Sequence, residues 1–133
     1  MHTINVKPHE VFQACADPTR IRIVRLLAET DEEACLCELV DSLQEPAYKL
    51  SRHLKILRQA GLLTTQKDGR WVYRHLVSEP PYLDTLYATV RALPDPDQVY
   101  QTDLARFKER MCLREDGRCR VGILSEDLKA EAN

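Results

Sequence analysis

The chain has 133 residues, a size typical of one compact domain with an arm or a tail. Hydrophobic residues make up 44% and charged residues 30%, and no stretch approaches the ~20 uninterrupted apolar residues of a membrane span, which excludes a membrane protein. The start, Met1 to Asn5, lacks the basic-then-apolar order of a secretory signal. We therefore expect a cytoplasmic protein whose five cysteines are buried thiols, metal ligands or redox groups rather than disulfides.

The net charge of −2 conceals an uneven distribution of charge along the chain. Residues 47 to 75 hold seven lysines and arginines against the single acid Asp68, a local charge of +6 that leaves −8 for the rest. A solvated face could account for such a cluster. Its width and the near-absence of acids favour a polyanionic partner instead.

The first half of the chain predicts three helices. Apolar residues from Val11 to Cys15 indicate a short helix that ends at Asp17-Pro18, and a core helix then starts with Asp17 or Thr19 as its cap. Thr30 and Glu33 have the spacing of a capping box, which predicts a helix start just before Cys35 that carries the helix to about Leu43.

The second half predicts a basic helix, a hairpin and two more helices. The basic helix begins at Ala47 and stops at Gly61, and strand-forming runs at 62–66 and 71–77 flank an Asp-Gly turn signal. Helical spacing returns at 83–93 and at 99–111. The polar end that follows is expected to be partly disordered.

This order predicts a mostly α protein with a small β-hairpin, the arrangement of a winged helix-turn-helix. We place the DNA-binding and dimerisation domain at residues 1–95, and the C-terminal helix with a flexible, cysteine-containing tail at 96–133.

The basic helix and the hairpin tip supply the predicted contacts to double-stranded DNA. Arg52 could bond bidentately to guanine, the short Ser51 lets the backbone approach the duplex, and Lys55 suits a phosphate. His53 could equally face DNA or close the helix packing. The predicted DNA-binding residues are Lys49, Ser51, Arg52, His53, Lys55, Arg58, Lys67 and Arg70.

Cys35 and Cys37 are the candidate ligands of a soft metal or metalloid. The spacing Cys-x-Cys is not the Cys-x-x-Cys of redox motifs and zinc knuckles. On a regular helix two such side chains point about 200° apart. They could therefore hold one atom only if the helix is distorted or has not yet begun at Cys35, and this conflict suggests a switch in which binding strains the turn that feeds the basic helix. Two buried cysteines that merely pack are the other interpretation.

Three motifs together resemble the ArsR/SmtB metalloregulators, specifically the arsenic-responsive repressors. They are the runs at 16–23, 35–39 and 50–62, and the resemblance covers roughly residues 8 to 95. It implies a homodimeric repressor that binds an inverted-repeat operator, pairs through its first and last helices (residues 8–16 and 82–93), and is released by As(III) or Sb(III). The zinc site of this family on the last dimer helix looks absent, because residues 82–93 contain Asp84 but no histidine.

The third sulfur that trivalent arsenic prefers has no obvious position, because Val40 stands where the best-known pattern, Cys-x-Cys-x-x-Cys, has its last cysteine. We favour Cys119, which lies in a polar segment and resembles the Gly-Arg-Cys tail of some arsenic repressors. Cys112 is the second choice and Cys15 the third, and packing would also explain both.

Two alternative functions remain open at this stage. The same DNA-binding module could sense Cd(II), Zn(II) or oxidation through its cysteines. A cysteine enzyme would need a histidine partner and an oxyanion hole. No such motif accompanies the cysteines, so we expect no enzyme.

Overall fold

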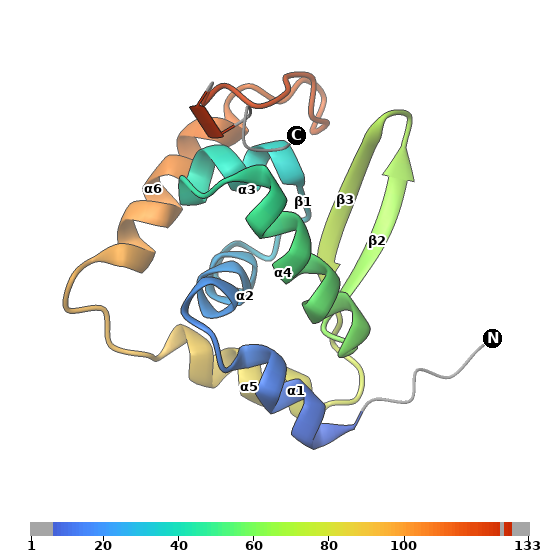
Figure 1. Cartoon of the computed structure of the whole chain (residues 1–133), viewed down its shortest axis with the longest axis vertical. Helices are drawn as coiled ribbons and strands as arrows, with labels where there is room; N and C mark the ends of the chain where they lie inside the picture. The colour runs from blue at the N-terminus through green and yellow to red at the C-terminus, as the bar shows by residue number, and fades with distance from the viewer. Residues whose placement is uncertain (1–6, 126, 129–133) are drawn as a thin grey trace.

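The computed structural model describes residues 7–125, 127 and 128, so the leader prediction at Met1 to Asn5 lies outside the described residues. The described chain forms six helices and three strands (Figure 1). The helices are α1 Pro8–Cys15, α2 Pro18–Thr30, α3 Leu36–Leu43, α4 Ala47–Gln59, α5 Tyr82–Arg91 and α6 Val99–Met111. The strands are β1 Ala34–Cys35, β2 Leu63–Asp68 and β3 Trp71–Leu76.

Helix α2 occupies the centre of the helical part, and α1, α4, α5 and α6 all pack on it (Figure 1). Pro18 occupies its first turn, and the Asp17 carboxylate accepts the N–H groups of Thr19 and Arg20, so of the two predicted caps Asp17 is the one observed. Its apolar residues Ile23 and Leu27 are almost completely buried in the core. This core fixes the frame on which α3 and α4 lie.

The helix-turn-helix pair is α3 and α4, joined by a turn at residues 44 to 46. Gln44 ends α3 in the left-handed conformation (φ 55°) and Pro46 precedes the first residue of α4. Leu50, Leu54 and Leu57 bury one stripe of α4 against the core, while the basic side chains lie on its other side. Gly61 adopts φ 91° just after α4, as the predicted helix stop requires.

The wing is the hairpin of β2 and β3, which extends away from the helices (Figure 1). Gly69 takes a positive φ of 64° in the predicted Asp-Gly turn. A third strand was not predicted. The two-residue β1 pairs antiparallel with β3, and in that register Cys35 lies opposite Tyr73.

The prediction of a capping box at Thr30 and Glu33 is wrong. Thr30 is the last residue of α2, and its hydroxyl donates to the Leu26 carbonyl. Helix α3 begins five residues beyond Asp31, with Cys35 as its N-cap, and the carboxylate that accepts the Cys35 N–H belongs to Glu38 at 2.9 Å. The Thr30 signal failed because strand β1, not a helix, follows the end of α2.

The segment after α6 folds back across α3 toward the wing (Figure 1). The sequence predicts that this polar end is partly disordered. Over the described residues up to Ser125 it makes hydrogen bonds to side chains of α3 and α6, and it buries Cys119 to 1% exposure. None of the described helices is both long and apolar enough to cross a membrane.

The predicted dimerisation helices α1 and α5 lie at the end of the molecule opposite this segment (Figure 1). Phe12 on α1 is 58% exposed. The division at residue 95 and the use of residues 8–16 and 82–93 as a dimer interface remain predictions.

Candidate metal centre and nucleic-acid interface

Three cysteines from distant parts of the chain meet beside the start of α3. The sulfur atoms of Cys35, Cys37 and Cys119 all lie within 4.8 Å of one another, and those of Cys37 and Cys119 are 3.6 Å apart. All three side chains are buried, with exposures of 2%, 7% and 1%. The group therefore brings together the two cysteines of the Cys-x-Cys motif and the favoured third cysteine.

The two neighbouring cysteines converge because the helix has not yet begun at the first of them. Cys35 is in extended conformation (φ −83°, ψ 159°) as the last residue of β1, whereas Cys37 lies in the first turn of α3. The 200° separation of a regular helix does not apply across this boundary. Binding of one atom by both cysteines therefore does not require a distorted helix. Of the two arrangements that the sequence allowed, the structure shows the one in which the helix has not yet begun at Cys35.

Glu38 and Arg114 hold the boundary between β1 and α3 in place. Glu38, fully buried, accepts the Cys35 N–H and forms a two-point pair with Arg114, at 2.8 and 2.9 Å. Arg114 also donates to the Glu33 carbonyl at 2.7 Å. These bonds fix the backbone on both sides of Cys35.

Cys119 is held by contacts on two sides of its segment. Its N–H donates to the Tyr73 hydroxyl at 2.8 Å. Further along, the buried Asp41–Arg110 ion pair (2.7 Å) fastens the segment, because Arg110 donates to the Val121 and Gly122 carbonyls and Asp41 accepts the N–H of Leu124. The third sulfur is therefore positioned by the surrounding fold.

The cluster favours one thiolate at neutral pH. Hydrogen bonding from the Cys35 thiol, reinforced by the Cys119 thiol and the positive charge of Arg110, lowers the pKa of Cys37 to about 7 despite its burial. The same hydrogen bond to Cys37, together with burial, raises the pKa of Cys35, and burial next to Glu38 raises the pKa of Cys119 to about 11. The three thiols therefore titrate as one coupled group. Cys37 is the thiol that most readily becomes the thiolate, and hence the nucleophile.

The two alternative ligands, Cys15 and Cys112, lie outside the group of three sulfurs in the structure. Cys15 is buried in the main core with α1 and α2, in agreement with the packing interpretation. Cys112 is exposed just after α6, and its thiol lies 3.5 Å from the Lys108 carbonyl. Neither belongs to the three-sulfur group found among residues 7–125, 127 and 128.

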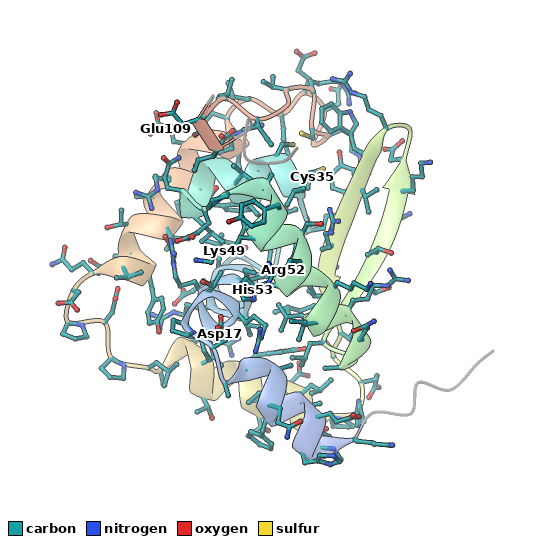
Figure 2. The ribbon with its side chains drawn as sticks, viewed as in Figure 1. Asp17, Cys35, Lys49, Arg52, His53 and Glu109 are labelled. Carbon is teal, nitrogen blue, oxygen red and sulfur yellow. The ribbon has the colours of Figure 1, made fainter. Side chains whose placement is uncertain are left out.

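The predicted DNA-binding residues lie on α4 and on the wing, and Figure 2 shows Lys49, Arg52 and His53 on α4. Ser51, Arg52 and Lys55 line a hollow of about 400 Å³ along α4, next to the exposed Tyr48. Lys49 is engaged with Glu45 at 2.8 Å, a carboxylate that also accepts Arg22. The residues exposed to solvent are Ser51, Arg52, Lys55, Arg58, Lys67 and Arg70.

His53 turns toward α2. Its Nδ1 atom lies 3.1 Å from the Arg20 guanidinium and 3.8 Å from the Asp17 carboxylate. Burial is the main cause that lowers the pKa of His53 below its usual value. Of the two roles left open by the sequence, the geometry favours the packing of α4 on α2.

Comparison with known proteins agrees with this arrangement. Residues 17–65 match the model of the bacterial regulatory protein arsR family. The arsenic resistance transcriptional regulator ArsR1 of Pseudomonas putida is 45% identical over 104 residues, which are 77% of this chain and 78% of that protein. The chain belongs to the arsR family.

Other members of the arsR family match shorter parts of the chain. The arsenical resistance operon repressor of Escherichia coli is 43% identical over 74 residues, 56% of this chain and 62% of that protein. The transcriptional repressor SmtB of Mycobacterium tuberculosis is 45% identical over 67 residues, about half of each chain. The protein is thus a metal-responsive transcriptional repressor of the arsR family with a helix-turn-helix DNA-binding domain, and it is not an enzyme.

Several residues that build the centre were not found from the sequence of this arsR-family member. Arg110 and Arg114 on and after α6 reach Asp41 and Glu38 on α3, and Tyr73 reaches Cys119. The four-residue spacing of Arg106, Arg110 and Arg114 is a signal for one helix face. Nothing in the sequence indicated which element that face meets.

Proposed function

We propose that this repressor senses trivalent arsenic or antimony, which bind as the inducer to the thiolates of Cys35, Cys37 and Cys119. The observation that carries the proposal is the meeting of three buried sulfurs within 4.8 Å. Arsenite, As(OH)₃, would exchange its three hydroxyl groups for three sulfurs. Each thiol proton leaves with one hydroxyl as water, so arsenic keeps its oxidation state.

The composition of the group supports a three-coordinate, sulfur-seeking centre. Three sulfurs match the coordination that trivalent arsenic prefers, whereas structural zinc sites take four ligands. Burial also keeps water away from the bonds formed. The names of the Pseudomonas putida and Escherichia coli relatives, which concern arsenic resistance, agree with this choice.

The proposed partner is double-stranded operator DNA with an inverted repeat, bound by a homodimer. Two copies related by a two-fold axis would present α4 to successive major grooves, with the wings beside them. The local charge of +6 over residues 47 to 75 supports a phosphate-bearing partner. Arsenic capture would lower the affinity for that DNA.

A response to Cd(II), Zn(II) or oxidation is the second candidate. The 3.6 Å separation of the Cys37 and Cys119 sulfurs favours a disulfide between them under a peroxide oxidant, which would be reduced to water as the two thiols lose two electrons. The similarity to the repressor SmtB supports a divalent metal.

Titration of the reduced protein bound to a fluorescent operator separates these candidates. We expect arsenite and antimonite to release the DNA at lower concentrations than zinc, cadmium or peroxide do. Excess dithiol chelator should restore binding. Unchanged DNA binding in saturating arsenite would refute the arsenic assignment, and release by cadmium, zinc or peroxide alone would replace it with the second candidate.

Replacing Arg52 and Lys55 singly by alanine should distinguish base contacts from phosphate contacts. Arg52→Ala is expected to cost roughly 1–3 kcal/mol of operator binding and to relax sequence preference, because the guanidinium would lose a bidentate contact to guanine. Lys55→Ala should weaken binding to all sequences evenly and reduce the salt dependence by about one counterion. Anisotropy titrations on operator and scrambled DNA at several salt concentrations measure both effects. An equal loss on both DNAs for Arg52→Ala would mark it as a phosphate contact.

A further inference from the structure

Tyr73 on the wing strand β3 contacts the cysteine cluster from two directions. It lies opposite Cys35 in the antiparallel pairing of β1 with β3, and its hydroxyl accepts the Cys119 N–H at 2.8 Å. Its side chain is 1% exposed. Any rearrangement of either cysteine therefore reaches this one buried side chain.

The residue beside Cys119 makes a second connection to the wing. The Arg118 guanidinium lies 3.9 Å from the centre of the Tyr73 ring and pairs with Asp68, the last residue of β2, at 2.9 Å. The segment that carries the third sulfur is thus attached to the hairpin at its buried strand and near its tip. Figure 1 shows this segment running toward the upper end of the hairpin.

The wing tip that Arg118 and Tyr73 hold also carries predicted DNA contacts. Lys67 and Arg70 flank the Asp-Gly turn, and Arg70 is separated from Tyr73 by two residues of a strand paired along its length with β2. A paired hairpin moves largely as a unit. A shift at Tyr73 is therefore carried to Lys67 and Arg70.

Capture of one centre by all three sulfurs fixes the distances between them. Sulfurs bonded to a common atom at about 2.3 Å lie about 3.4 to 3.8 Å apart. The three sulfurs lie within 4.8 Å of one another, so binding draws together any pair that lies beyond the bonded span. Cys35 is confined by the sheet and by Glu38, and Cys37 lies in a helix, whereas Cys119 belongs to no helix or strand.

We propose that Tyr73 is a positioning residue that couples the cysteine site to the wing, so that inducer binding displaces the hairpin from the DNA. This inference rests on the proposed arsenic response. It assigns the regulated motion to the wing, because Cys119 and Arg118 bond to Tyr73 and Asp68 of the hairpin, in addition to Cys37 and Glu33 near the start of α3.

The test compares Tyr73→Phe, which keeps the ring and removes the hydroxyl, with Tyr87→Phe. Tyr87 is a matched control, since it is also buried and its hydroxyl donates to the Val77 carbonyl, in the main core. Arsenite binding is measured by equilibrium dialysis, and operator affinity with and without saturating arsenite by anisotropy. We expect Tyr73→Phe to reduce the loss of DNA affinity at saturating arsenite by about tenfold, within the usual range of coupling between sites, whatever arsenite affinity the dialysis gives for this variant.

A second pair of variants replaces two arginines that lie outside the hydrophobic core. Arg118→Ala removes the contacts to Asp68, to Glu33 and to the Tyr73 ring. Arg120→Ala, at an exposed arginine whose side chain donates to the Cys119 carbonyl, removes the same charge without those contacts. Arg118→Ala should reduce the coupling and Arg120→Ala should not. Full wild-type coupling in both Tyr73→Phe and Arg118→Ala would overturn the proposal.

The sole tryptophan gives a readout that does not depend on DNA. Trp71 lies at the start of β3 and packs against the cysteine cluster, with Arg70 4.4 Å above its ring. Arsenite should change Trp71 emission in the wild type and change it less in Tyr73→Phe. If arsenite changes Trp71 emission but leaves operator binding intact, the proposed function fails while the link to the wing holds; if emission stays constant in arsenite-loaded wild type, the link fails.

Discussion

Cys37→Ser is expected to remove the arsenite response while leaving operator binding at its wild-type strength. Cys37 is the thiolate preferred at neutral pH and the nearest sulfur to Cys119, at 3.6 Å. Serine keeps the size and removes the sulfur ligand, so two sulfurs remain for a centre that prefers three. We expect at least about a 100-fold higher arsenite concentration for half-release of the DNA, measured by anisotropy in reducing buffer.

Cys35→Ser tests the same centre without risk to the helix start. Cys35 is the N-cap of α3, a position that serine favours, so the fold should be retained. The loss of response should match that of Cys37→Ser. Cys112→Ser is the control, because that thiol is exposed and lies outside the three-sulfur group. Release of the DNA at wild-type arsenite concentrations by either cluster variant would remove the Cys-x-Cys pair from the site.

Asp41→Ala should cause the largest loss of stability among the substitutions considered. The pair Asp41–Arg110 is buried, and alanine at 41 would leave the Arg110 charge facing only carbonyl groups while the N–H groups of Leu124 and Ser125 lose their acceptor. Breaking such a pair from one side costs about 3–5 kcal/mol. Urea unfolding followed by circular dichroism measures the loss, and alkylation of Cys119 in the folded protein should become faster.

Two further variants separate the ion pair from general effects of charge. Glu109→Ala removes an exposed acid next to Arg110, and we expect it to change stability by no more than about 0.5 kcal/mol (Figure 2). The double change Asp41→Ala with Arg110→Met removes both charges and should recover part of the loss. A cost below about 1 kcal/mol for Asp41→Ala would mean that the segment after α6 is held by other contacts.

The sequence predicted the elements that local physics decides. The cap at Asp17, the stop at Gly61 and the turn at Gly69 each depend on one residue and its immediate neighbours, and all three are confirmed. The winged helix-turn-helix followed from the order of these elements. The basic stripe of α4 followed from the spacing of its leucines.

What the sequence did not predict depends on contacts between distant segments. Strand β1 has only two residues and exists because β3 offers a partner, so no local pattern could show that the helix starts after Cys35. The sequence predicts Cys119 as a ligand because the residues around it are polar and do not indicate a core position. It is in fact one of the most buried residues, because Asp41, Arg110 and Tyr73 satisfy the polar backbone around it.

The distance in sequence between Cys37 and Cys119 has a thermodynamic consequence. These two positions are 82 residues apart, and the chain between them includes α4, the wing, α5 and α6. An atom bonded to both sulfurs closes a covalent ring around almost two thirds of the protein. By the chain-entropy treatment of crosslinks, such a ring disfavours the unfolded chain by about 4.5 kcal/mol. The bound inducer would then act as a reversible crosslink. The protein released from its operator would thus also be the form that best resists heat and proteolysis.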